Sequence, residues 1–344
     1  MTERSDLLES IANTIKDYRA GEIAAPTPVH VDRWVKQFEK GVQVPLLREM
    51  DHVFKKTYLN KETITGFLNG LVKNKKLAGQ NPCVFWGKAH FLQIQQNGHS
   101  QKEMLELFDK SLDAQCGIRV KGCGEKNGEY IYLDDAMFSG NRVGNDLAAW
   151  IEQHAPLTAT AHVVVAAIHT GGEYLVGKRL QKVIADSGKK VKINYWRAVI
   201  IENRKYYKND SEVLWPSEIP EDDQVKQYLA KPHKFPFEPR KPGGKLGPFS
   251  SEEGRQLLER ELLMAGVKIR ALSEHPKDII RPLGFSPFGL GFGSMIVTFR
   301  NCPNNTPLAL WWGDPEATSG PFHWYPLLPR KTYAQSFDFA AFGL

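Results

Sequence analysis

The stretch EYIYLDDAMFSGNRVGND, residues 129–146, decides how this chain is expected to fold. It opens with an apolar run of aromatic and branched residues, which predicts a β-strand. The expected strand ends at two adjacent carboxylates, Asp134 and Asp135, and a loop from Ala136 to Asn141 leads into helical periodicity over NRVGNDLAAWIEQH. A strand, a short loop and a helix in this order are the unit from which parallel α/β sheets are built.

The neighbouring segments repeat this alternation. Strands are predicted at CVFWG (83–87), HFLQIQ (90–95), AHVVVAAIHT (161–170) and VKINYWRAVIIE (191–202). Helices are predicted at SQKEMLELFDKSLD (100–113) and GGEYLVGKRLQKVIADSG (171–188). Strands that alternate with helices of this length indicate an α/β fold with a doubly wound, mostly parallel sheet.

Two further regions flank or interrupt this pattern. Residues 1–80 have helical periodicity and predict an N-terminal helical region, followed by an α/β domain over 81–344. Residues 209–249, acidic and then basic and proline-rich, show neither period, so we expect an insertion or lid. Beyond it, residues 250–266 predict a helix, 267–272 and 294–300 predict strands, and the tail from 301 is expected to be irregular.

Composition narrows the class of protein. The formal net charge of +6 is a mild basic excess, which suits phosphate-rich ligands but not a dedicated DNA-binding tail. The four cysteines, at positions 83, 116, 123 and 302, have no zinc-site spacing, so we expect free, buried thiols in a reducing cytosol. No run has the length of a membrane span or signal-peptide core, which predicts a soluble, cytoplasmic protein without a membrane partner.

The acidic pair and its loop suggest a ligand. In an open α/β sheet, ligands bind beyond the carboxyl ends of the strands. Backbone N–H groups of a loop entering a helix bind anions, and here Gly140 would allow close approach while Ser139 adds a hydroxyl. Carboxylates would repel an anion, so their expected partners are sugar hydroxyls or a divalent metal. A phosphorylated ribose meets all these demands; a solvated acidic pair beside a capping serine is the alternative.

This pattern resembles the phosphoribosyl pyrophosphate motif of type I phosphoribosyltransferases. The hydrophobic strand corresponds to residues 131–133, the acidic pair to Asp134 and Asp135, and the Thr-Gly step to Ser139 and Gly140. The resemblance implies that both aspartates act in catalysis by holding the ribose 2′ and 3′ hydroxyls, and that Mg²⁺ is the cofactor. It implies a 5′-phosphate loop made of Ala136, Met137, Phe138, Ser139, Gly140, Asn141 and Arg142.

Two residues depart from that motif. Phe138 stands where the family often carries an acidic residue that can serve as a base, which makes purine-salvage chemistry doubtful. Arg142 stands where the family usually has a hydroxyl residue, and its guanidinium could bind the phosphate through two hydrogen bonds.

A second resemblance covers more of the chain. Residues 250–266, 281–294 and 297–314, together with WVKQF at 34–38, are similar to phosphoribosyltransferase-like proteins of bacterial conflict systems. Some of these proteins are encoded beside retron reverse transcriptases in anti-phage cassettes. The resemblance implies an effector role in defence and a reverse transcriptase–nucleic acid complex as partner.

Other residues are weaker candidates. Asn97, Gly98 and Ser100 could form a pyrophosphate loop, although a capped turn explains them equally well. His169, after the 161–170 strand, could be an acid or base or part of a helix-capping turn. An acceptor site could be formed by Asn301, Asn304, Asn305 and Trp312, which are otherwise turn and core residues.

The sequence therefore supports two hypotheses. The first is a defence effector that binds phosphoribosyl pyrophosphate or a related ribose phosphate and transfers or cleaves at its anomeric carbon. The second, motivated by Phe138 and Arg142, is a catalytically inactive sensor that binds a nucleotide or nucleic acid and regulates a partner.

Overall fold

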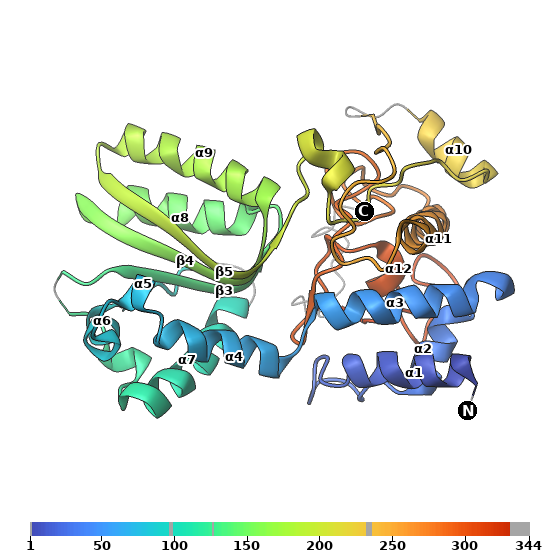
Figure 1. The fold of residues 1–344 in the computed structure, drawn as a ribbon. Helices are drawn as coiled ribbons and strands as arrows, with labels where there is room; N and C mark the ends of the chain where they lie inside the picture. The colour runs from blue at the N-terminus through green and yellow to red at the C-terminus, as the bar shows by residue number, and fades with distance from the viewer. Residues whose placement is uncertain (1, 96–98, 126, 232–235, 331–344) are drawn as a thin grey trace. The chain divides into compact units, whose positions relative to one another are not determined.

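The computed structural model describes residues 2–95, 99–125, 127–231 and 236–330 (Figure 1). Internal contacts divide the chain into two compact units. Residues 61–201 form one, here called the sheet unit, and residues 1–60 with 202–344 form the other, the helical unit. This division differs from the expected boundary at residue 80, because the helices between 61 and 88 belong with the sheet.

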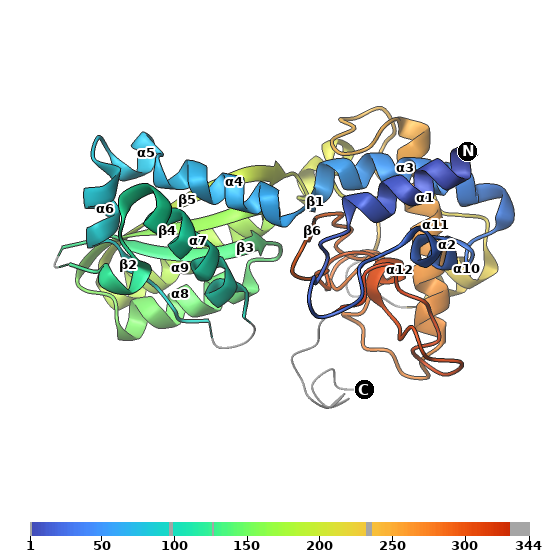
Figure 2. The ribbon, with the colours of Figure 1, turned by 90° about the horizontal axis from the view of Figure 1, so that it is seen from below.

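The sheet unit is an α/β sandwich, as the sequence predicts. Its parallel strands follow the order β2 (His90–Phe91), β3 (Tyr130–Met137), β4 (Thr158–His169) and β5 (Lys190–Ile201). One face carries α8 (Asn141–Gln153) and α9 (Thr170–Ser187) (Figures 1 and 2). The other carries α4 (Lys61–Val72), α5 (Lys75–Ala78), α6 (Pro82–Lys88) and α7 (Ser100–Cys116), and η2 (Val120–Gly122) precedes β3.

The apolar run of β4 explains why it lies at the centre of this sheet. Every residue from Ala161 to His169 is buried, as expected of a strand covered on both faces. Val163 and Val165 pack in one core with Leu147 of α8 and Leu180 of α9. Burial of each such side chain contributes about 1.5–3 kcal/mol, so the helix faces and the strand hold each other in place.

The opposite face corrects one predicted strand. CVFWG (83–87) lies in α6, whose first turn begins at Pro82. Trp86 is fully buried there, donates its indole N–H to the carbonyl of Val72 (2.9 Å) and packs edge-on against Phe108 (centroids 4.9 Å apart). The run is too short for its period to separate strand from helix, and this packing decides for the helix.

The cysteines also differ in part from expectation. Cys83 of α6 and Cys116 at the end of α7 form a disulfide, with their Cα atoms 5.3 Å apart. Cys302 is buried and free, as predicted, and Cys123 is free but only half-buried. The pairing needs α6 to run beside α7, which cysteine spacing alone does not reveal.

The helical unit contains the remaining elements. Its helices are α1 (Glu3–Thr14), α2 (Pro28–Val35), α3 (Gln43–Thr57), α10 (Asp223–Ala230), α11 (Glu252–Ala271) and α12 (Leu308–Trp311). Short elements are η1 (Lys40–Val42), η3 (Lys205–Asp210), and the parallel pair β1 (Tyr58–Leu59) and β6 (Val297–Thr298).

The expected strand at 294–300 is reduced to β6, and the tail expected to be irregular contains α12; two further predictions fail in the helical unit. The expected strand at 267–272 is the last part of α11, where Val267 and Ile269 are buried as helix residues. The segment 209–249, expected to lack regular structure, contains α10. The Asp222 carboxylate caps that helix by accepting a hydrogen bond from the N–H of Val225 (2.9 Å). The N-cap residue therefore marks the start of this helix, although the segment has no long periodic pattern that would predict it.

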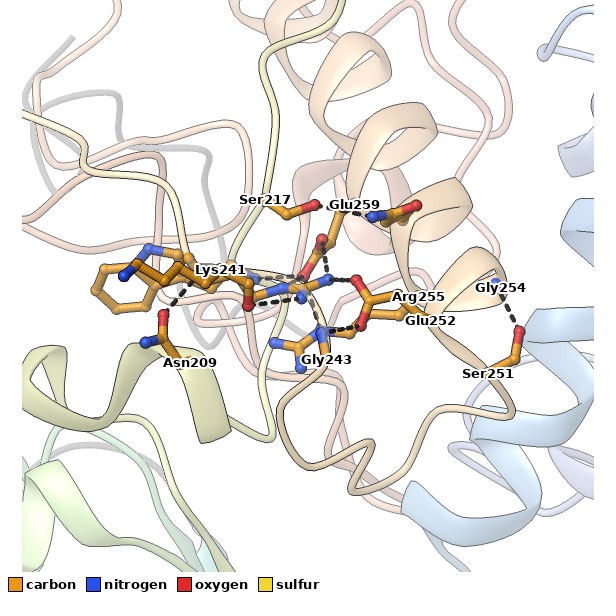
Figure 3. Close-up of polar contacts among 12 residues, drawn as sticks. Asn209, Ser217, Lys241, Gly243, Ser251, Glu252, Gly254, Arg255 and Glu259 are labelled. Atoms are coloured by element: carbon orange, nitrogen blue, oxygen red, sulfur yellow. Dashed lines mark hydrogen bonds and ion pairs between the residues drawn. The ribbon is translucent and has the colours of Figure 1, made fainter.

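A buried ionic network ties the segment 209–249 to α11 (Figure 3). Glu259 pairs with the fully buried guanidinium groups of Arg240 and Arg255, both at 2.9 Å. Arg255 also donates to the hydroxyl of Ser211 (2.9 Å), and Glu259 accepts from the backbone N–H of Trp215 (3.1 Å). Arg240 also pairs with Glu252 (2.7 Å), so two carboxylates compensate the two guanidinium groups and the network fixes the path of the segment across the helix.

Candidate functional site

The acidic pair lies inside β3, near its carboxyl end. Asp134 pairs with Val165 of β4, and the pairing continues to Met137 opposite Ile168. The strand is therefore longer than the sequence suggests, and Ala136 and Met137 belong to it rather than to the loop. The connection to α8 consists of residues 138–140 only.

Asp134 is an unusual carboxyl group for a strand. Only 3% of its surface is exposed. Burial and the neighbouring charge of Asp135 raise its pKa to about 7, although a hydrogen bond from Ser100, the Arg142 guanidinium and the backbone N–H of Asp135 (2.9 Å) favour the charged form. Near neutral pH such a carboxyl can donate or accept a hydrogen bond, as recognition of a sugar hydroxyl requires.

Ser100 joins the predicted pyrophosphate loop to the acidic pair. Its hydroxyl oxygen accepts hydrogen bonds from the side-chain amide of Gln95 (2.9 Å) and the guanidinium of Arg142 (3.4 Å). The same hydroxyl donates a hydrogen bond to the Asp134 carboxylate. Two separate predictions, at Ser100 and at residues 134–142, are thus brought together in space. Asn97 and Gly98 lie outside the described residues.

Sequence reasoning missed two glutamines, Gln95 and Gln101, one on each side of residues 96–98. The side-chain oxygen of Gln101 accepts from the backbone N–H groups of Ile94 (2.8 Å) and Gln95 (3.1 Å), and that of Gln95 accepts from the N–H of Gln101 (3.1 Å). The amide nitrogen of Gln101 is buried and has no partner in the part of the chain that the structure describes. Two glutamines flanking a Gly-containing loop were the available signal.

The start of α8 offers the predicted anion donors. Gly140 caps the helix in a left-handed conformation (φ 75°), and the first helical hydrogen bond runs from Gly144 N–H to Gly140 C=O (2.8 Å). The N–H groups of residues 141–143 precede that bond, so they have no carbonyl acceptor within the helix. Ser139 Oγ lies at 3.5 Å from the N–H of Asn141, at the limit of a hydrogen bond. These N–H groups, at the positive end of the helix dipole, suit a phosphate.

The glycines of this region serve packing as well. A Cβ at Gly140 would lie 2.3 Å from Cγ2 of Val176, and one at Gly172 would lie 2.0 Å from the carbonyl oxygen of Phe138. The loop therefore lies directly on the first turn of α9. Close approach at Gly140, predicted for a ligand, is also required by the fold itself.

His169 is part of the support beneath the loop. Its ring is fully buried and packs against Phe138, with the centroids 4.9 Å apart. Nδ1 lies 3.1 Å from the carbonyl oxygen of Met137, so this nitrogen carries the proton and donates it. Burial lowers the pKa of His169 to about 4, which keeps the ring neutral. Of the two expectations, acid–base residue or helix start, its position immediately before α9 matches the second.

A second acidic residue lies near Arg142. The hydroxyl of Tyr132 donates to Asp146 Oδ2 at 2.8 Å. Burial raises the pKa of Asp146, while the Tyr132 hydrogen bond and the Arg142 charge oppose that rise. Arg142, in the first turn of α8, thus interacts electrostatically with both Asp134 and Asp146. The i, i+4 spacing of Arg142 and Asp146 was the overlooked sequence signal.

The predicted acceptor residues belong to the helical unit. Trp312 is buried, donates its indole N–H to Pro321 C=O (2.9 Å) and stacks on Phe322 (5.7 Å). The side-chain amide of Asn305 donates a hydrogen bond to the backbone carbonyl of Phe285 (3.1 Å). The backbone N–H of Phe285 donates to the carbonyl of Asn304 (2.7 Å). Asn301 forms an isolated bridge with Thr298. These contacts are those of core and turn residues, and acceptor binding by them stays a prediction.

The donor set at the acidic pair is compatible with Mg²⁺. Among the described residues no group of three or more His, Cys, Asp or Glu side chains could hold a metal ion. Mg²⁺ commonly uses one or two carboxylates and completes its coordination with water and substrate phosphates. Asp134 and Asp135 are the carboxylates that would hold such an ion.

The parallel sheet between helical layers, the acidic pair near the carboxyl end of β3 and the loop into α8 are the features of a phosphoribosyltransferase-like α/β protein. The chain belongs to the PRTase-CE family, whose match extends over residues 31–330. No curated protein and no solved structure matches the chain. Within the described ranges, no helix has the length and apolar character needed to cross a membrane.

Proposed function

We propose that this protein binds phosphoribosyl pyrophosphate, or a related ribose phosphate, at Asp134, Asp135 and residues 136–142. The observation that carries the proposal is the convergence of Asp134, Ser100 and Arg142 beside the N-terminus of α8. Carboxyl groups suited to accept hydrogen bonds from hydroxyls and N–H groups suited to bind a phosphate are adjacent along one strand–loop–helix unit.

Each group has a distinct part in binding. Asp134 and Asp135 accept hydrogen bonds from the ribose 2′ and 3′ hydroxyls. The N–H groups of residues 141–143 and the Arg142 guanidinium hold the 5′-phosphate. Ser100, fixed by Gln95, positions Asp134 and places the start of α7 near the diphosphate.

The reaction is transfer or cleavage at the anomeric carbon. The bond between C1′ and the leaving diphosphate oxygen breaks, and a bond from C1′ to an acceptor or water forms. The protein holds the ribose and shields the cationic centre that develops at C1′, which requires positioning more than covalent chemistry. Mg²⁺, when bound, would neutralise charge on the departing diphosphate.

We further propose that this activity serves an effector in anti-phage defence, acting in the cytoplasm beside a reverse transcriptase–nucleic acid complex. Membership of the PRTase-CE family and the similarity of residues 34–38, 250–266, 281–294 and 297–314 to conflict-system proteins support this role. Replacing Asp134 and Asp135 with Asn should abolish toxicity or phage protection in cells. The matched control, Asp113→Asn with Asp186→Asn, makes the same charge change at exposed sites of the sheet unit and should retain both. Full activity of the first variant would refute the proposal.

A second function is favoured by one contact. Phe138, at the position where related motifs often carry a base, has no group that accepts a proton, and the His169 ring on which it packs is buried. The site would then bind a nucleotide and regulate a partner without catalysis. Incubation with phosphoribosyl pyrophosphate and Mg²⁺ separates the two functions. Pyrophosphate release that the Asp134→Asn/Asp135→Asn variant loses would exclude the inactive sensor.

A further inference from the structure

A pocket of about 540 Å³ lies in the sheet unit, apart from the acidic pair. Its volume is within the range of small-ligand sites, roughly 300–1,000 Å³. Its polar and aromatic lining includes Lys76 of α5, Glu129 immediately before β3, His162 of β4, and Lys192, Asn194 and Trp196 of β5.

The strand register places this pocket on the sheet face away from α8 and α9. His162 pairs with Asn194, two residues after Thr160 pairs with Lys192, so these side chains share one face. Val165, the partner of Asp134, has the opposite parity and packs in the core with α8 and α9. The lining residues of β4, and those of β5 except Trp196, also lie in the amino-terminal halves of these strands, whereas the acidic pair is near the carboxyl end of β3.

The floor of the pocket is a fixed hydrogen-bond chain. The indole N–H of Trp196 donates to Nδ1 of His162 at 2.8 Å. Because that nitrogen accepts, the ring proton is on Nε2, which donates to the carboxylate of Glu129. His162 is only 4% exposed, so its ring orientation is set before any ligand arrives. The Glu129 carboxylate is engaged by this chain rather than by a lysine.

The rim of the pocket is cationic. Lys76 of α5 and Lys192 of β5 are exposed, and neither ammonium forms an ion pair with any residue that the structure describes. With Glu129 as the one lining carboxylate, two positive charges exceed one negative charge. Two ammonium groups in a pocket that an indole, a histidine and an amide also line favour an anion that carries a planar ring with hydrogen-bonding edges.

We propose that this pocket is a second ligand site and that it binds a nucleoside monophosphate. Lys76 and Lys192 hold the phosphate, the Trp196 indole contacts the base, and Asn194 bonds to a polar edge of the base. The site does not depend on the acidic pair, so it stands or falls separately from the ribose phosphate site proposed above.

The experiment is calorimetric titration of the full chain with AMP, GMP, CMP and UMP in turn. We expect micromolar binding of at least one of them. The Lys76→Gln/Lys192→Gln variant should bind it about tenfold more weakly or worse, because two charge-assisted hydrogen bonds are lost. The matched control, Lys75→Gln/Lys190→Gln, removes two exposed lysines from the same elements and should bind normally. The corresponding nucleoside, which lacks the phosphate, should bind more weakly than the monophosphate.

The Asp134→Asn/Asp135→Asn variant distinguishes the two sites. It should bind the monophosphate as the wild type does. Loss of binding in this variant, with normal binding by Lys76→Gln/Lys192→Gln, would place the nucleotide at the acidic pair and overturn the proposal. Absence of binding of all four monophosphates by the wild type would overturn it as well. Unchanged melting temperatures of the lysine variants confirm that they are folded.

Discussion

Replacing Asp134 with Asn should stabilise the protein, although the same change should destroy ligand binding. The substitution keeps the shape of the side chain and removes its charge. Burial and the charge of Asp135 raise the pKa of Asp134 from the ordinary 3.8 to about 7. A difference of about 3 units corresponds to a cost of about 4 kcal/mol for the ionised carboxyl in the folded state.

The pH dependence has a definite sign. Between pH 3.8 and 7 the folded wild type holds a proton on Asp134 that the unfolded chain has released, so its stability falls as pH rises through this window. The Asn variant lacks this loss. The free energy of unfolding of the variant should exceed that of the wild type by little near pH 4 and by about 4 kcal/mol at pH 8. Because Asp134 is fully buried, solvent screening does not reduce this figure substantially.

Urea denaturation at pH 5 and pH 8 measures this effect. The difference in unfolding free energy between variant and wild type should grow by about 3 kcal/mol from the lower to the higher pH. Asp113→Asn, at an exposed position of α7, should show no comparable growth. An Asp134→Asn difference that is the same at both pH values would refute the reasoning. A variant that is more stable but does not bind would show that the acidic pair costs stability for the sake of function.

Three further changes test the account. The pKa of His169 is about 4 in the folded protein instead of 6.5, so the free energy of unfolding should fall by about 3 kcal/mol as the pH falls from 6.5 to 4. Denaturation of the His169→Gln variant at pH 7 and pH 4.5 should show that this decrease is absent. Glu259→Gln leaves buried guanidinium groups short of charge and should cost about 3–5 kcal/mol by urea denaturation, whereas exposed Glu253→Gln should change stability by less than about 0.5 kcal/mol; equal effects would contradict the network. In Gly140→Ala the new Cβ would strain a left-handed backbone and clash with Val176, so the free energy of unfolding should fall by about 1–3 kcal/mol. An unchanged melting temperature would show that the loop adapts.

The sequence predicted the long periodic elements well. β3, α8, β4, α9 and β5 follow one another as expected, because each has a clear period and a turn or cap at its ends. The acidic pair was placed correctly on its strand. The strand's extension through Met137 was missed, because pairing with β4 continues beyond the apolar run.

The two wrong strand predictions share a physical cause. CVFWG and residues 267–272 are short apolar runs for which both periods fit, and tertiary burial of Trp86 and Ile269 decided for a helix. The contacts of Ser100 with Asp134 and Arg142 join residues 34 to 42 positions apart, so they depend on how α7 is placed beside β3. No local pattern in the sequence records such a placement.

The most direct test of the central claim is calorimetric titration of the purified chain with phosphoribosyl pyrophosphate, with and without Mg²⁺. We expect micromolar, Mg²⁺-dependent binding by the wild type that the folded Asp134→Asn/Asp135→Asn variant loses. Absence of binding by the wild type, or equal binding by the variant, would contradict it.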